Sequence, residues 1–202
     1  MKKYICILIL SSAFAGSLYA QQNVEDDVKV IRELYQKAQD FIKHDVDDPT
    51  VEYQLTMTLQ RLYPIGGPQT QHYDFYFDWE NDKNGNRVPR LKFIRMKSTT
   101  GGLHNEEFLF NEKGEFVFYF SKFDYFVDMD NDEVEMRLYY NYGSCIRNLL
   151  KTKAHGTGKI TELTTLPEDY QHIADYVPRE ATRLWNLFQR AMDNPLWEMM
   201  VN

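Results

Sequence analysis

The sequence predicts an α+β fold, in which an antiparallel meander sheet of about seven strands is covered on one face by N-terminal and C-terminal helices. Three observations predict this fold. Apolar residues recur with a helical period at both ends of the chain, they alternate with a period of two in the middle, and only short, turn-like segments join the alternating stretches. Short connections between such strands place sequence neighbours side by side in the sheet.

The N-terminal helix is predicted from a single apolar stripe between polar faces. Asn23 can cap its start, and the acidic residues that follow are favoured in a first helical turn. The helix should end before Pro49. The stripe consists of Val24, Val28, Ile31, Leu34, Tyr35, Ala38, Phe41 and Ile42.

Seven later stretches are predicted to be strands. Residues 51–60, 73–79 and 133–141 alternate strictly between apolar and polar, which is typical of antiparallel strands with one buried and one exposed face. Residues 115–127 begin apolar on both faces, which favours a central place in the sheet. Weaker patterns mark strands at residues 90–97, 104–111 and 145–151.

The turn at Gly85 sets a predicted register between two of these strands. Matching their apolar faces pairs residues whose numbers sum to about 168. Phe77 should then oppose Leu91, and Phe75 should oppose Phe93, all on the core face of the sheet.

Two helices are predicted at the C-terminal end, separated near Pro178. The second carries an apolar stripe in which Trp185 and Phe188 are the largest side chains. Both are expected to insert into the covered face of the sheet.

The first 20 residues have the pattern of an export signal. Lys2 and Lys3 precede an apolar core at Tyr4–Gly16 that is too short for a stable membrane anchor, and cleavage is expected after Ala20. Residues 21–202 then form a single domain. We expect a periplasmic or secreted protein with no membrane insertion after signal cleavage.

The charge of the mature chain limits its partners. After loss of the signal, 21 basic and 30 acidic residues remain, a formal charge of −9. This balance argues against nucleic acid, which requires a basic face. Only Cys145 remains, so the chain can form no internal disulfide, and we expect an inert, buried or half-buried thiol.

An acidic loop gives the sequence its one metal-site candidate. Asp78, Glu80, Asp82 and Asn84 alternate along the chain, and these side chains are calcium ligands in other proteins. An EF-hand is excluded, because Leu91 occupies the position of its bidentate glutamate and strand alternation precedes the loop. A hairpin turn is the favoured interpretation, with a different calcium loop as the alternative.

A second acidic loop contains Asp128, Asp130, Asp132 and Glu133. Successive loops of a meander alternate between the two ends of the sheet. The second and fifth connections therefore lie at opposite ends, and the two acidic loops should not form one site.

No residues form a recognisable catalytic motif, and no cofactor-binding motif is present. Tyr76 and Tyr139 are the candidate binding residues, since both fall on the polar face of their strands. Exposed aromatic side chains there can stack on sugars or anchor peptides.

The export signal, the charged amphipathic helix and the segment "EEFLFNEKGEFVFYF" at Glu106–Phe120 resemble a class of small exported proteins of Gram-negative bacteria with no assigned function. In these proteins a similar turn joins two aromatic strands. The expected helix-and-meander arrangement is also similar in shape to a cystatin-like or NTF2-like roll, a likeness that implies no function.

Three functions are consistent with these observations. The first is an exported non-catalytic binding or interaction module with an unknown protein or glycan partner. The second is a small-ligand-binding or hydrolytic domain with a pocket between helix and sheet, for which Arg95 and Lys97 are polar candidates on the covered face. The third is a calcium-stabilised module.

Overall fold

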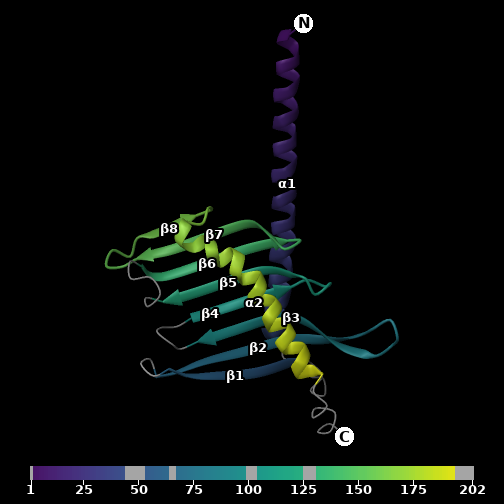
Figure 1. The fold of residues 1–202 in the computed structure, drawn as a ribbon, viewed down its shortest axis with the longest axis vertical. Helices are drawn as coiled ribbons and strands as arrows, with labels where there is room; N and C mark the ends of the chain where they lie inside the picture. The colour runs from purple at the N-terminus through teal and green to yellow at the C-terminus, as the bar shows by residue number, and fades with distance from the viewer. Residues whose placement is uncertain (1, 44–52, 64–66, 99–103, 125–130, 194–202) are drawn as a thin grey trace.

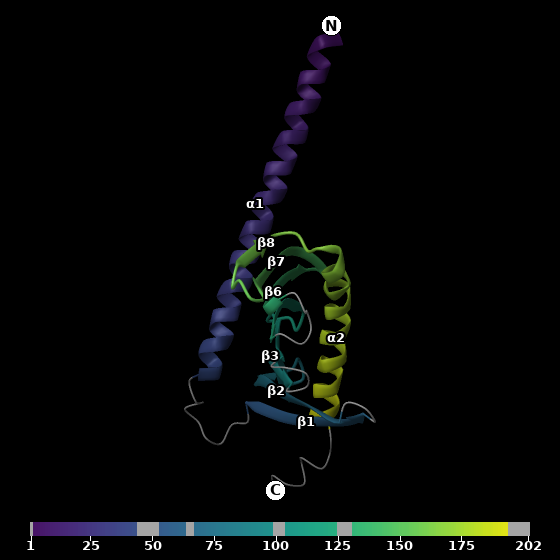
Figure 2. The same ribbon diagram turned by 90° about the vertical axis from the view of Figure 1, so that its left-hand side faces the viewer.

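The computed structural model describes residues 2–43, 53–63, 67–98, 104–124 and 131–193. One open, eight-stranded antiparallel sheet lies between two long helices (Figures 1 and 2). The elements, in chain order, are α1 (Lys2–Lys43), β1 (Gln54–Tyr63), β2 (Gly67–Asn81), β3 (Arg87–Ser98), β4 (His104–Phe110), β5 (Phe116–Asp124), β6 (Asn131–Asn141), β7 (Ser144–Ala154), β8 (Ile160–Leu163) and α2 (Glu168–Met192). The predicted α+β class and the meander are confirmed.

Each strand pairs with the next along the chain, in the order β1 to β8. The β2–β3, β4–β5 and β6–β7 hairpin turns therefore lie at one end of the sheet (Figure 1). The sheet has one strand more than expected. The extra strand, β8, is short and exposed, and its sequence carries no alternating pattern.

The two helices cover opposite faces of the sheet, not one face as we expected (Figure 2). The reason lies in the central strands, which carry large apolar side chains on both sides. Phe108 and Tyr119 belong to the core beneath α2, whereas Phe93, Leu109 and Phe118 belong to the core beneath α1. A sheet that is apolar on two faces needs a cover on each.

The apolar stripe predicted for the first helix is confirmed in full. Val28, Ile31 and Ala38 are buried against the sheet, and the other five stripe residues are partly buried in the same cluster. The N-terminal part of α1 extends past the sheet, and the C-terminal part crosses its face (Figures 1 and 2). The predicted signal lies wholly in the extending part. In the part of the chain that the structure describes, no helix is long and apolar enough to cross a membrane.

The C-terminal helix is continuous through Pro178, where two helices were expected. Proline has no backbone N–H and leaves the carbonyl four residues earlier without its helical partner. Here that carbonyl belongs to Ala174, and the Tyr140 hydroxyl donates a 2.9 Å hydrogen bond to it. A side chain of the sheet thus supplies the donor that the helix lacks.

Of the two aromatic side chains expected to insert into the sheet, only Phe188 does so. Its side chain is fully buried, with its ring centroid 5.9 Å from that of Phe75 and 5.3 Å from that of Phe77. Trp185 is 37% exposed, so its prediction was wrong. The buried stripe of α2 runs through Leu184 and Phe188, and Trp185 lies beside it.

The predicted β2–β3 register is confirmed near the turn and wrong beyond it. Phe77 opposes Leu91 as expected, but a bulge follows, and Phe75 then opposes Ile94. The extra residue is Lys92 on β3. Because one added residue inverts the faces of the rest of a strand, Phe93 lies beneath α1, on the other side of the sheet from Phe75.

Candidate functional site

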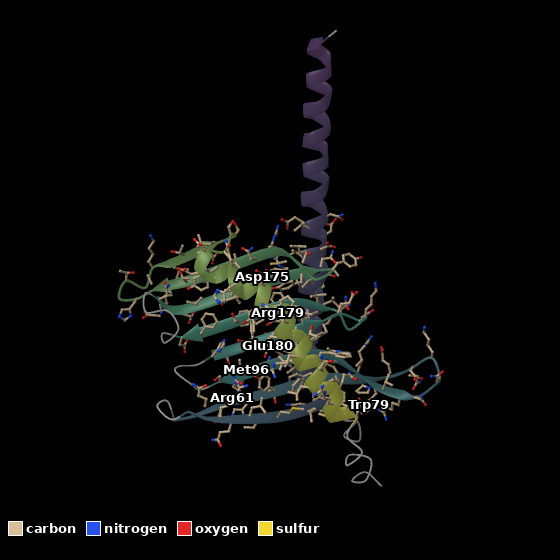
Figure 3. The ribbon with its side chains drawn as sticks, in the orientation of Figure 1. Arg61, Trp79, Met96, Asp175, Arg179 and Glu180 are labelled. Carbon is tan, nitrogen blue, oxygen red and sulfur yellow. The ribbon has the colours of Figure 1, made fainter. Side chains whose placement is uncertain are left out.

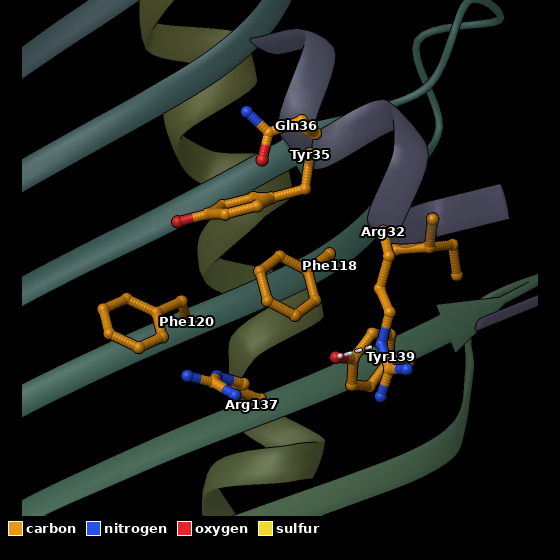
Figure 4. A pocket seen from close by; sticks show the side chains of 8 residues that line it. Arg32, Tyr35, Gln36, Phe118, Phe120, Arg137 and Tyr139 are labelled. Carbon is orange, nitrogen blue, oxygen red and sulfur yellow. Dashed lines mark hydrogen bonds between the residues drawn. The ribbon is translucent and has the colours of Figure 1, made fainter. Parts of the chain in front are cut away.

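A cavity of about 370 Å³ lies between α1 and strands β5 and β6 (Figure 4). Its volume falls within the roughly 300–1,000 Å³ that is usual for ligand sites. Its lining residues are Ile31, Arg32, Tyr35, Gln36, Phe118, Phe120, Arg137 and Tyr139.

The helical period of α1 supplies one wall of the cavity. Residues 31, 32, 35 and 36 lie on adjacent positions of two successive turns, so that they project to the same side of the helix. Ile31 is buried and anchors this side against the sheet. The polar members, Arg32 and Gln36, are exposed toward the cavity mouth.

Strand β5 supplies the aromatic floor because it contains a bulge. The β4–β5 register shifts between Leu109 and Phe110, which makes Val117 the extra residue of β5. Val117 and Phe118 consequently both belong to the cluster beneath α1, and Phe120 follows on the same face. The pairing of Phe118 with Tyr139 brings β6 alongside.

Ring contacts hold this floor together. The Phe118 ring lies 5.1 Å from that of Tyr35 and 5.0 Å from that of Tyr139, measured between centroids. The guanidinium of Arg137 lies 5.9 Å from the Phe120 ring centroid, and that of Arg32 lies 5.7 Å from the Tyr139 centroid. Tyr35 therefore contacts Phe118, Arg137 lies over Phe120, and Arg32 lies beside Tyr139 (Figure 4).

A polar network beside the cavity fixes α1 against the sheet. The Tyr35 hydroxyl donates a 2.5 Å hydrogen bond to Glu107 on β4, and Arg95 on β3 forms a 3.2 Å ion pair with the same carboxylate. Gln39 accepts a 3.2 Å hydrogen bond from Arg95. Burial, and then the charge of Glu107, raise the pKa of Tyr35, so this hydroxyl remains a donor.

The β3 bulge at Lys92 also places Arg95 in this network, since it turns Phe93 and Arg95 toward α1. Arg95 was expected on the same face as Leu91, but it lies on the opposite face, beneath α1, and it does not line the cavity. Lys97 is exposed and does not line the cavity.

The lining combines an aromatic floor with a few polar groups. Two guanidinium groups, two phenol groups and a carboxamide provide hydrogen-bond donors around this floor. None of the eight lining residues is a serine, cysteine, histidine, lysine or carboxylate, and the phenols of Tyr35 and Tyr139 are the lining groups that can exchange a proton. Among the described residues no cluster of three or more metal-ligating side chains occurs.

Tyr76 and Tyr139, expected to be exposed, are buried beneath α1, with 6% and 4% of their surfaces accessible. The sequence assigned them to the face of the sheet opposite the main core, but α1 covers that face. Tyr76 packs on Phe93, with 6.3 Å between ring centroids. Tyr139 is in the cavity wall and accepts a 3.4 Å hydrogen bond from Arg32.

The side chains of the first acidic loop are engaged by the protein itself. Asp78 forms ion pairs with Arg90 and with Lys92, whose ammonium lies 2.6 Å from the carboxylate, and Glu80 pairs with Arg90 at 2.7 Å. The β2–β3 hairpin extends beyond the neighbouring strands, with Trp79 near its base (Figures 1 and 3).

The turn itself is closed by Asp82. Its Oδ1 accepts hydrogen bonds of 2.8 Å from the backbone N–H groups of both Asn84 and Asn86, and Gly85 has a positive φ of 83°. These bonds to Asn86 and Asn84 lower the pKa of Asp82. The arrangement is that of a tight hairpin turn, in which the carboxylate accepts hydrogen bonds from the backbone of the same turn.

The second acidic loop lies only partly within the described residues, because Asp128 and Asp130 fall outside them. Asp132 contacts His155 at 2.5 Å, and Glu133 forms a 2.8 Å ion pair with Lys122. Both begin β6, at the end of the sheet opposite the β2–β3 turn.

Cys145, at the start of β7, is exposed. From the sequence we expected its side chain to be buried or half-buried. Its thiol donates a weak 3.4 Å hydrogen bond to the carbonyl oxygen of Arg147. Partial desolvation of the thiol raises its pKa, which disfavours the reactive thiolate.

Most cavity residues were missed at the level of sequence. The signal for Phe118 and Phe120 was present, since their strand is apolar on both faces. Arg32 and Gln36 flank the apolar stripe of α1 and look like ordinary surface residues. Only the bulge in β5, which the sequence does not mark, brings these groups together.

Comparison with protein-family models, curated protein sequences and solved structures gives no match for this chain. The function of the cavity is therefore inferred from its own geometry.

Proposed function

We propose that this chain is an exported, non-catalytic binding protein that holds a small ligand in the cavity between α1 and the sheet. It combines the first two functions that the sequence allows: a binding module, and a pocket between helix and sheet. The export signal supports a periplasmic or secreted location, and the acidic charge of the mature chain disfavours nucleic acid as the ligand.

The cavity itself is the observation that supports this function most strongly. It is of ligand size, lies between elements that a separate network fixes in place, and has an aromatic floor with polar groups at its rim. Known small-molecule sites have this combination of apolar walls and a few placed polar groups. Ordering α1 through Tyr35, Glu107 and Arg95 lowers the entropy lost on binding.

The interaction module with an open sheet face receives less support. The face on which Tyr76 and Tyr139 were expected to meet a partner is covered by α1. A protein or glycan partner would therefore have to bind elsewhere, whereas a small molecule fits the cavity.

The test uses N-phenyl-1-naphthylamine, a neutral apolar dye that fluoresces when it leaves water. We expect the mature chain, residues 21–202, to bind one dye per molecule. Gln36→Trp places an indole at the cavity mouth, on an exposed helix position that leaves the fold intact. It should weaken dye binding at least about 10-fold, the effect of losing roughly 1.4 kcal/mol of binding free energy.

Val30→Trp is the matched control, because residue 30 is exposed on the same helix and does not line the cavity. Its dye affinity should stay within about twofold of the parent. Equal weakening of dye binding by the two tryptophan variants contradicts the proposed function.

A further inference from the structure

We infer that the ligand of this cavity is a small organic anion, with its charged group at Arg32 and Arg137 and a planar apolar part on Phe118 and Phe120. This inference rests on the proposed function and specifies its ligand. It follows from the placement of the rings and from the positive charge around the cavity, which contrasts with the acidic charge of the whole chain.

The local charge is positive although the chain as a whole is acidic. The charged groups that line or adjoin the cavity are four arginines, at positions 32, 95, 137 and 147, and three glutamates, at 25, 107 and 135. Each glutamate is paired with an arginine other than Arg32, namely Arg147, Arg95 and Arg137 in turn, so one positive charge is left over. That excess lies in a protein whose mature chain carries a formal charge of −9.

Arg32 carries this excess charge. Among the described residues no carboxylate lies within ion-pairing distance of its guanidinium. Its one hydrogen bond to these residues runs from Nε to the Tyr139 hydroxyl and is long, at 3.4 Å. A guanidinium has five N–H groups in a planar fork, which suits carboxylate, sulfonate and phosphate oxygens. The group is at the rim of the cavity, where an anion can reach it (Figure 4).

Arg137 completes the recognition of the anion. One of its Nη groups is 2.6 Å from Glu135, while its guanidinium lies over Phe120 at the cavity floor. The contact with Glu135 leaves other N–H groups for a ligand. The charge of Arg137 also reaches the opposite wall, where it lowers the pKa of Tyr35 against the larger opposing effects of burial and Glu107.

The planar part of the ligand is inferred from the floor. Phe118 and Phe120 are two residues apart on one face of β5, and both line the cavity. Aromatic rings favour planar, apolar partners by stacking or by edge contacts. A charge alone would be held weakly at this open rim, whereas a ring on the floor adds buried apolar surface.

The discriminating experiment compares two dyes that share a ring system. 8-Anilinonaphthalene-1-sulfonate carries a sulfonate that the neutral N-phenyl-1-naphthylamine lacks. Because hydrogen bonds to charged groups are stronger than those between neutral groups, we expect the parent protein to bind the sulfonate at least about 10-fold more tightly.

Arg32→Gln should remove most of this preference: the affinity for the sulfonate should fall about 10-fold and the affinity for the neutral dye less than about twofold. Arg32→Lys keeps the charge and should retain a large part of the preference for the sulfonate. Arg190→Gln is the matched control, since Arg190 is exposed on α2, on the other side of the sheet, and should leave both affinities unchanged. The thermal unfolding of each variant is measured to confirm that it is folded.

The outcomes separate the two proposals. Equal affinities for the two dyes, or a sulfonate affinity that Arg32→Gln leaves unchanged, would overturn the anionic ligand while the cavity remained a binding site. If neither dye binds, the proposed function itself fails.

Discussion

The Tyr140 hydroxyl donates a 2.9 Å hydrogen bond to the carbonyl oxygen of Ala174, the carbonyl that Pro178 leaves without a helical partner. This contact joins β6 to the middle of α2. It explains how one helix of 25 residues runs across a proline and crosses the strands of the sheet (Figure 1).

Tyr140→Phe should therefore destabilise the fold by about 1–3 kcal/mol, the cost of an unsatisfied buried acceptor. Pro178→Ala restores a backbone N–H at this carbonyl and should offset part of the loss. Chemical denaturation of the two single variants and the double variant measures the coupling. Tyr142→Phe, at an exposed tyrosine of the neighbouring turn, is the control and should have no effect. Additive effects of Tyr140→Phe and Pro178→Ala would contradict this explanation.

Phe188→Ala should be far more damaging than Trp185→Ala. Phe188 is fully buried against Phe75 and Phe77, and truncating such a side chain costs about 3–5 kcal/mol. Trp185 retains contact with water, so its truncation should cost about half as much or less. Equal losses of unfolding free energy would show that Trp185 packs in the core as the sequence suggested.

The contrast between these two residues shows what the sequence could predict. Periodicity identified the whole apolar stripe of α1, seven strands and helical segments on both sides of Pro178, because these features depend on local patterns of burial. The face of α2 was harder, since a helix with several large apolar residues offers more than one buried stripe. Trp185 follows Leu184 directly and therefore lies about 100° round the helix from it. Because Leu184 is buried against the sheet, Trp185 is turned away from the core.

The cavity was harder still to predict, for a related reason. Bulges in β3 and β5 invert the faces of Phe93 and Phe118, and nothing in a single sequence marks the extra residue. The inverted Phe93 and Phe118 join Tyr76, Leu109 and Tyr139 in the apolar face that α1 covers.

The pKa of Asp82 should lie below its usual range, because backbone N–H groups of Asn86 and Asn84 stabilise the carboxylate. A depressed pKa contributes stability at pH values above the unfolded pKa, about 3.9, and loses it as the pH falls through the folded value. Titration of the side-chain carboxyl carbon by NMR measures this.

Asp82→Asn keeps the acceptor oxygen and should remove this part of the acid sensitivity. The β4–β5 turn already uses Asn111 in the same way, with its Oδ1 accepting bonds of 2.9 and 3.0 Å from the backbone of Lys113 and Glu115. An Asp82 that titrates at or above its ordinary value would contradict the turn as described.

Calcium at low-millimolar concentration should leave the melting temperature nearly unchanged. Asp78 and Glu80 are ion-paired, and Asp82 is bonded to its own turn. Binding at a hundred times the dissociation constant would add about 2.7 kcal/mol, which raises the melting temperature by several degrees in a domain of this size. A shift of that size, lost in Asp82→Ala, would establish a calcium site in this loop.

We propose that the space between α1 and strands β5 and β6 binds a small ligand. Its most direct test is a titration of the isotopically labelled mature chain with 8-anilinonaphthalene-1-sulfonate, followed in proton–nitrogen NMR spectra. We expect the largest shifts at the backbone amides of residues 31–36, 118–120 and 137–139, the three segments that line the cavity. Shifts centred on the smaller cavity of about 220 Å³ beneath α2, whose lining includes Phe123, Ile173 and Tyr176, or spread evenly over the surface, would contradict it.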